Sequence, residues 1–225
     1  MHGPEQSGAA RRESSASADL SWEALRFAER RYRGLVRPRG RTPYLDHVAA
    51  VAGHVIEVGG SDALVCAAYL HDLVEDGGAE ASELVELFGE EIAGLVLAVT
   101  DVAVNPDTGT ATSWSDRRRA GVRLARQAGA DVCCLKACDL WANVDELLTG
   151  HARHGVAIFD HYAVDARRQI GYYVALADAL MEHLDHPRLR NVLGDRRDAL
   201  LELAERESIK LRKGDLKRRR VKMSG

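Results

Sequence analysis

The sequence predicts an all-α protein, a bundle of about eight or nine helices. Apolar residues recur at helical spacing in most segments between residues 19 and 208, the strict alternation of a half-buried strand is essentially missing, and no internal repeat is visible. At 225 residues, with 46% hydrophobic and 29% charged residues, the chain suits one globular domain with a real core.

Cap signals place the first expected helices. One lies near residues 19–33, where large apolar side chains begin. Pro43 lies at the first turn of the next helix, which the Gly59–Gly60 pair ends. Ser61 can then cap the helix that leads to His71.

The second half of the chain carries similar signals. Gly89 can close the helix that contains Leu84. After a loop at 101–112, Ser113 and Asp116 have the Ser-x-x-acid form of a capping box, which starts another helix. Long periodic segments follow near residues 130–148, 156–185 and 187–208.

The two ends fall outside the domain expected at residues 19–208. Residues 1–18 are rich in Ser, Ala, Gly and charged residues with almost no large apolar side chain, which is typical of a disordered leader. Residues 209–225 form a strongly basic tail. Because the tail has no aromatic residue to stack on bases, a solvated tail is favoured over nucleic-acid binding.

Composition narrows the classes of partner and compartment. The formal net charge of −3 favours no particular partner, and no uncharged apolar stretch approaches the roughly 20 residues of a membrane span. Because the N-terminus also lacks a hydrophobic signal core, we expect a cytoplasmic protein without a membrane partner. The four cysteines lie in apolar segments without Cys-x-x-Cys spacing and are interpreted as reduced core residues. The sequence leaves the oligomeric state open.

A run of ionisable side chains follows the uncharged segment 63–70. Residues 71–76 read His-Asp-Leu-Val-Glu-Asp. We expect this run to lie on the same helix, where residues three and four apart share a face, so that His71 lies over Glu75, and Asp72 over both Glu75 and Asp76. A buried segment cannot carry so many charges unless a cation or hydrogen bonds compensate them, which points to a metal-dependent active site. The alternative is a solvated helix end before Gly77.

Candidate partners for this run lie on other predicted helices. His47 lies near the start of an apolar periodic segment, although a single histidine there is more often structural. Asp139 lies in an apolar helix, with Lys136 three residues before it and Asn143 four residues after it on the same face. A simple buried ion pair between Asp139 and Lys136 is the alternative.

The order of these residues along the chain resembles that of the HD-domain metal-dependent phosphohydrolases, whose ligands follow the order His, His-Asp, Asp. The resemblance is closest to the alarmone hydrolases, both the small ones and the hydrolase half of the long RelA/SpoT enzymes, and it spans about residues 25–180. The metal ligands that it implies are His47, His71, Asp72 and Asp139.

The ligand types suit particular metals. Imidazole and carboxylate ligands suit manganese, iron or zinc better than calcium or magnesium. No histidine occurs between Asp72 and Asp139, where dinuclear members of the family carry additional ones, so we expect one divalent ion per chain, with Mn²⁺ as the leading candidate. Glu75 and Asp76 follow the ligands, and these two carboxylates are the candidate catalytic residues that orient a water and move its proton.

The resemblance also implies residues of a nucleotide pocket. Arg37 takes the place of the family's pocket arginine, and Asn143 matches a position that touches the nucleotide. Tyr172 falls about where the small hydrolases carry a pocket tyrosine, although core packing explains it equally well. Lys136 is the fourth substrate-binding candidate.

Three departures from the alarmone hydrolases bear on this pocket. The family usually shows His-x-Gly-Gln where this chain has residues 32–35, Tyr-Arg-Gly-Leu. It has His-Pro where this chain has His47-Val48, and it tends to carry a Lys where this chain has Leu140. The metal site therefore matches the family better than the nucleotide pocket does.

The sequence thus predicts a divalent-metal-dependent phosphohydrolase that acts on a nucleotide. The leading substrate is guanosine tetraphosphate (ppGpp), with release of its 3′-pyrophosphate. Two alternatives stay open: another nucleotide or phosphoester as substrate, and a nucleotide-sensing module without turnover. The Glu75–Asp76 pair argues against a pure sensor, because a sensor needs no carboxylates that move protons.

Overall fold

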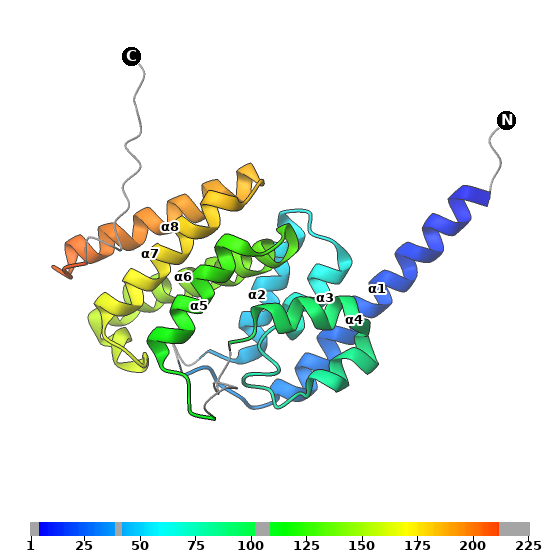
Figure 1. Cartoon of the computed structure of the whole chain (residues 1–225), viewed down its shortest axis with the longest axis horizontal. Helices are drawn as coiled ribbons and strands as arrows, with labels where there is room; N and C mark the ends of the chain where they lie inside the picture. Colours follow the sequence, from blue (N-terminus) through cyan, green and yellow to red (C-terminus); the bar gives the residue numbers. More distant parts are fainter. Residues whose placement is uncertain (1–4, 39–41, 102–108, 212–225) are drawn as a thin grey trace, which may run out of the picture.

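The computed structural model describes residues 5–38, 42–101 and 109–211, with side chains from residue 19 onward (Figure 1). These residues form eight α-helices and one short 3-10 helix, and within those ranges there is no strand, although Val36 and Pro43 form an isolated bridge. The predicted all-α class is confirmed. The helices are α1 (Glu5–Tyr32), α2 (Tyr44–Glu57), α3 (Asp62–Leu70), α4 (Ala81–Val99), α5 (Trp114–Gln127), α6 (Ala130–His154), η1 (Gly155–His161), α7 (Ala166–His183) and α8 (Pro187–Arg206).

Helix α6 lies between two groups of helices. On one side α1, α2, α3 and α4 pack together, and α2, α3 and α4 also contact α6. On the other side α7 packs against α5, α6 and α8. Figure 1 shows these groups, with α1, α3 and α4 to the right and α7 and α8 to the left. A side chain on α6 can therefore meet groups from both halves of the molecule.

Apolar residues cover more than one side of α6, which buries it. Leu135, Leu140 and Leu147 are at most 1% exposed, and burying each such side chain contributes roughly 2 kcal/mol. Lys136 and Asn143 are buried on the same helix. Because buried polar groups cost free energy unless they are paired, these two residues mark where α6 needs polar partners.

The predicted caps are present. Ser61 Oγ accepts a hydrogen bond from the Leu64 amide at 3.2 Å, and Ser113 Oγ accepts one from the Asp116 amide at 3.1 Å. Gly89 has φ +82° and divides α4 by a kink, as expected of a residue that closes one helix before the next begins.

The run at residues 71–76 is not a continuation of α3, and this part of the prediction is wrong. Helix α3 ends at Leu70, and the run forms successive turns, with the Leu73 amide bonded to the Leu70 carbonyl at 3.0 Å. Leu73 is fully buried, and a Cβ at Gly77 would lie 2.4 Å from its Cδ2. The backbone therefore passes close to the Leu73 side chain. Gly78 follows with φ +66°, a backbone conformation that favours glycine.

The segment expected as one helix over 156–185 is also divided. Helix α6 continues to His154, and Gly155, at φ +58°, ends it before the short helix η1. Helix α7 begins only at Ala166, where the Asp165 side chain accepts a hydrogen bond from the Arg168 amide at 2.9 Å. The helical spacing of apolar residues continues across this break, so the sequence did not reveal the end of α6 at Gly155 or the start of α7 at Ala166.

Parts of both terminal segments expected outside the domain belong to the described structure. Helix α1 begins at Glu5, inside the segment expected as a leader, because Ala, Glu and Arg sustain a helix without large apolar residues. Its first half projects from the bundle in Figure 1. Ile209 and Leu211 pack against the core, whereas the rest of the expected tail, residues 212–225, lies outside the described residues. None of the described helices combines the length and apolar character that a membrane span requires.

Candidate metal centre

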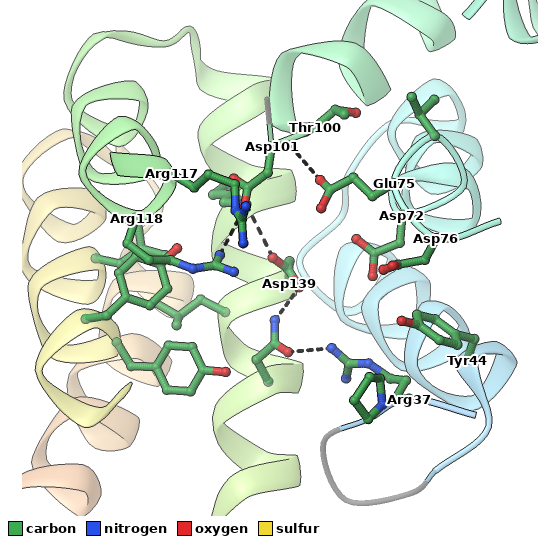
Figure 2. Close-up of a pocket in the computed structure, with 18 residues that line it drawn as sticks. Arg37, Tyr44, Asp72, Glu75, Asp76, Thr100, Asp101, Arg117, Arg118 and Asp139 are labelled. Atoms are coloured by element: carbon green, nitrogen blue, oxygen red, sulfur yellow. Dashed lines mark hydrogen bonds and ion pairs between the residues drawn. The ribbon is translucent and has the colours of Figure 1, made fainter. Parts of the chain in front are cut away.

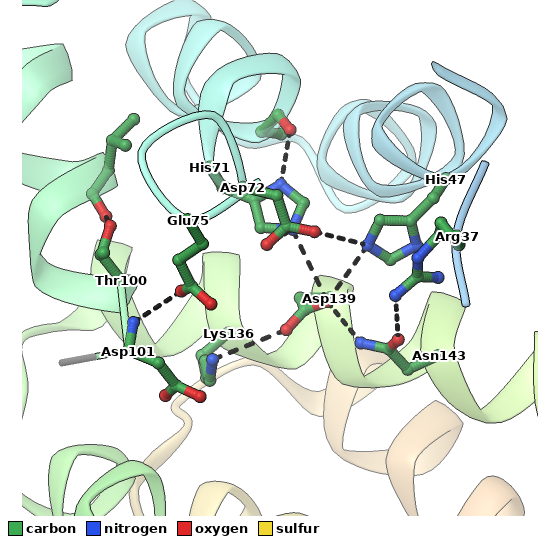
Figure 3. Close-up of polar contacts among 12 residues, drawn as sticks. Arg37, His47, His71, Asp72, Glu75, Thr100, Asp101, Lys136, Asp139 and Asn143 are labelled. Atoms are coloured by element: carbon green, nitrogen blue, oxygen red, sulfur yellow. Dashed lines mark hydrogen bonds and ion pairs between the residues drawn. The ribbon is translucent and has the colours of Figure 1, made fainter. Parts of the chain in front are cut away.

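Two helices and the turns after a third bring two histidines and two carboxylates together (Figure 3). His47 comes from α2, His71 and Asp72 from the turns after α3, and Asp139 from α6. His47 Nε2 lies 3.6 Å from Asp72 Oδ2 and 3.4 Å from Asp139 Oδ1. His71 Nε2 lies 3.2 Å from Asp72 Oδ1 and 3.7 Å from Asp139 Oδ1. The structure therefore gathers all four expected ligands, although the helix assumed for two of them is absent.

The two histidines present free nitrogen atoms to the centre. His71 Nδ1 donates to the Ala68 carbonyl at 2.9 Å, so in the neutral ring Nε2 carries the lone pair. Nε2 of His47 and Nε2 of His71 are both buried without a hydrogen-bond partner in the described part of the chain. Donor atoms of His47, His71 and Asp139 lie within 4.8 Å of one another. Buried nitrogens of this kind fit a divalent metal ion, which would satisfy both.

Charge and burial act in opposite directions in this cluster. Burial is the main reason that the pKa of His47 is lowered. Burial also opposes the charge of His71, but Asp72 and then Asp139 outweigh it and raise the pKa of His71 to about 9. Burial acts against the ionised Asp139 too, yet the two histidine rings that face it, followed by the charge of Lys136, hold its pKa well below its usual range. A site that keeps its carboxylates ionised at neutral pH is suited to a cation.

A chain of polar contacts links the cluster to the loop before α2. Asn143 Nδ2 donates to Asp139 Oδ1, and Asn143 Oδ1 accepts from Arg37 at 2.8 Å. The other side of the Arg37 guanidinium pairs with Glu146, which also accepts from the Thr42 hydroxyl. Asp139, Asn143 and Glu146 lie four and three residues apart on one face of α6. That spacing could have identified Glu146, which the sequence analysis missed.

The two candidate catalytic carboxylates line one cavity but face different partners. Glu75 accepts a hydrogen bond from the Asp101 amide at 2.6 Å. Loss of water around its carboxylate, and then the charge of Asp72, raise the pKa of Glu75 to about 7. Burial of the phenol, and then the charge of Asp76 and a hydrogen bond in which Asp76 accepts from the Tyr44 hydroxyl, raise the pKa of Tyr44.

Lys136 lies beneath the same cavity. Its Nζ is 3.6 Å from Asp139 Oδ2. Burial opposes its charge, but Asp139, followed by Tyr172, Asp101 and Glu75, raises its pKa. The ion pair proposed as the alternative for Asp139 is therefore present, and it coexists with the contacts of Asp139 to both histidines.

A cavity of about 530 Å³ opens above these groups (Figure 2). Arg37, Asn143 and Tyr172 all line it, as the resemblance implied. Tyr172 is also 9% exposed and its ring lies 6.0 Å from that of Trp114, so it belongs both to the core and to the cavity wall. Arg118, on α5, closes the far side through an ion pair of 3.2 Å with Asp101.

The chain is similar to proteins of known family. Residues 24–138 match the family described as HD domain. A probable guanosine-3′,5′-bis(diphosphate) 3′-pyrophosphohydrolase from Synechocystis is 42% identical over 67 residues, which cover 30% of this chain and 9% of that protein. The guanosine-3′,5′-bis(diphosphate) 3′-pyrophosphohydrolase MESH1 of Drosophila melanogaster is 29% identical over 129 residues, covering 56% and 68% of the two chains.

Among solved structures, a metazoan ortholog of SpoT that hydrolyzes ppGpp superposes with a TM-score of 0.63. The match covers 85% of this chain and 97% of that one at 22% sequence identity, so it establishes a shared fold. The first curated relatives are much longer proteins, of which this chain spans only 9% to 11%.

Proposed function

The chain belongs to the HD-domain family, and from that premise we propose that it is a divalent-metal-dependent hydrolase that removes the 3′-pyrophosphate from ppGpp. One observation carries the proposal: two buried histidine nitrogens, which have no hydrogen-bond partner among the described residues, face two ionised carboxylates on the floor of a cavity whose walls carry arginines and a lysine. The relatives named as 3′-pyrophosphohydrolases support the choice of substrate.

His47, His71, Asp72 and Asp139 would hold one ion, and Mn²⁺ suits this mixture of imidazole and carboxylate. When bound, such an ion acidifies a coordinated water and offsets phosphate charge. Asn143 fixes the orientation of the Asp139 carboxylate through its hydrogen bond.

Glu75 is proposed as the group that accepts a proton from the attacking water. Its raised pKa places it near neutrality, where a carboxylate is ionised yet basic enough to take a proton. The Asp101 amide holds one of its oxygens and leaves the other to face the cavity. Asp76, anchored by Tyr44, would orient the same water or the leaving group.

Positive side chains surround the place where the pyrophosphate would lie. Lys136 is buried beside Asp139, and Arg37 is fixed between Asn143 and Glu146. Groups held in this way need little reorganisation as charge develops on the pyrophosphoryl group that the water attacks, while the 3′-oxygen of GDP departs. The ring of Tyr172 offers an apolar wall for the nucleoside. A nucleotide substrate of this class also implies a cytoplasmic location.

A specific feature favours a second candidate, another nucleotide phosphoester as substrate. Leu140, which stands where the alarmone hydrolases tend to carry a lysine, lines the cavity and removes one positive charge from it. A less positive pocket suits a substrate with fewer phosphates.

A product assay tests the proposal. The manganese-loaded chain is incubated with ppGpp, GTP, GDP and deoxynucleotides, and products are separated by ion-exchange chromatography. We expect pyrophosphate and GDP from ppGpp, because the 5′-diphosphate is not presented to the metal cluster. Brisk hydrolysis of another phosphoester with none of ppGpp would refute the alarmone substrate and support the second candidate.

A further inference from the structure

A second cavity, of about 800 Å³, lies between α5 and α7. It shares Arg118 and Tyr172 with the wall of the metal cavity, and its other lining residues are its own. Six arginines line it: Arg118, Arg119, Arg123, Arg126, Arg167 and Arg168. Asp165 is the single carboxylate among the residues that line this arginine groove, and it is engaged in capping α7.

Carboxylates outside the arginine groove neutralise only some of these charges. Arg119 pairs with Asp116 at 2.6 Å, and Arg126 with Glu182 at 3.7 Å. Arg123 and Arg167 make no ion pair within 4 Å among the described residues. Like positive charges gathered on a concave surface repel one another and attract anions, so the groove is suited to binding an anion.

Aromatic contacts fix two of the guanidinium groups without using their N–H edges. Arg168 lies over the Trp114 ring at 5.0 Å and donates to the Ser115 hydroxyl. Arg118 lies 5.0 Å from the centre of the Tyr172 ring. Stacked in this way, a guanidinium keeps donors for a phosphate oxygen and loses little entropy when it binds one.

We propose that the arginine groove binds a polyphosphate anion, either an inorganic polyphosphate or the phosphate chain of a nucleotide, at a site separate from the metal cavity. Arg118 then couples the two cavities. It pairs with Asp101, whose amide holds Glu75, so an anion that draws Arg118 toward the groove changes the support of the candidate base.

Calorimetric titration of the metal-loaded full chain tests the site, with inorganic triphosphate as the probe and excess magnesium present to keep the phosphate from stripping the bound ion. The groove variant carries Arg123→Gln with Arg167→Gln. A matched control carries Arg26→Gln with Arg190→Gln, which removes equal charge from exposed positions on α1 and α8. We expect the groove variant to lose at least about tenfold in affinity, because two charge-assisted contacts are lost.

Two further measurements test where the triphosphate binds and whether the natural ligand is a nucleotide or an inorganic polyphosphate. The His71→Ala variant, damaged in the metal cavity, should keep triphosphate affinity within about twofold, since none of the residues that line the arginine groove is changed. If GDP binds more tightly than triphosphate, and Trp114→Ala removes this difference in affinity, the groove recognises a nucleotide. If GDP binds no more tightly, the groove recognises the phosphate chain alone. No binding, equal affinity in the groove and control variants, or binding lost in His71→Ala overturns the proposal. Because calorimetry detects binding without turnover, the result is independent of whether ppGpp is hydrolysed.

Discussion

His71 shows how a single residue is prepared for a metal. The Ala68 carbonyl fixes its tautomer, and Asp72 and Asp139 face its other nitrogen. We expect the purified chain to hold about one transition metal ion and His71→Ala to lose it, because removing a ligand costs more than the roughly 10- to 100-fold of an outer-sphere change. Elemental analysis by mass spectrometry measures this, with the exposed His161→Ala as the matched control. One metal ion per chain retained in His71→Ala would contradict the assignment of His71 as a metal ligand.

Glu75 separates proton transfer from metal binding. Glu75→Gln preserves shape and should retain the metal while kcat falls by about 100-fold or more, because the variant has no ionisable base. The exposed Glu86→Gln on α4 controls for the loss of a surface charge. Unchanged turnover in Glu75→Gln would move the proton-accepting role to another residue.

The pH dependence of turnover follows from the same side chain. The pKa of Glu75 is raised to about 7, and a base must be ionised to act, so kcat should rise as pH increases through that pKa. A bound cation nearby would favour the ionised form of Glu75, so the midpoint should fall between the usual range of a glutamate and 7. A pH–rate profile checks the sign, and an activity that falls across this range contradicts it.

At the scale of an element, α6 acts as a rigid support for the site. Glu146→Gln keeps a hydrogen-bond acceptor but leaves the Arg37 guanidinium, buried at 4% exposure, without its countercharge. We expect a loss of about 2 kcal/mol in the free energy of unfolding and a rise in KM, with metal content unchanged. Urea unfolding and steady-state kinetics measure these effects. The exposed Glu205→Gln should change neither, and a normal KM in Glu146→Gln would mean that Arg37 does not bind substrate.

The turns after α3 depend on a glycine. At Gly77 an added Cβ would lie 2.4 Å from Leu73 Cδ2 and 3.1 Å from the Leu73 Cα, so Gly77→Ala should destabilise the chain by about 1–3 kcal/mol. Gly53, within α2, has open space at the same position, and Gly53→Ala should stabilise the chain by about 0.5–1 kcal/mol. Thermal unfolding of the pair gives the comparison. Equal effects at both positions would contradict the packing described for Leu73.

The helices and turns around the site differ in how far the sequence could predict them. Residue spacing identified the face of α6 that carries Asp139 and Asn143, because helical period alone determines it. It did not identify the turns at residues 71–76, since these accompany the complete burial of Leu73 and depend on tertiary packing rather than on local propensity. Arg118 meeting Asp101 is likewise a contact between segments separated by a loop, so helical spacing could not predict it.

At the scale of the whole molecule, the metal centre joins α2 and the turns after α3 to α6, the helix that contacts both halves of the bundle. An ion that binds only the folded chain stabilises it by mass action, about 2.7 kcal/mol at a free concentration one hundred times Kd. We therefore expect chelation to lower the Tm of the full chain, while the Tm of the His71→Ala variant should not respond to the chelator. Scanning calorimetry with and without EDTA measures both. If chelation lowers the two melting temperatures equally, the stabilising ion is bound elsewhere and α6 is not tied to the first half of the molecule by this cluster.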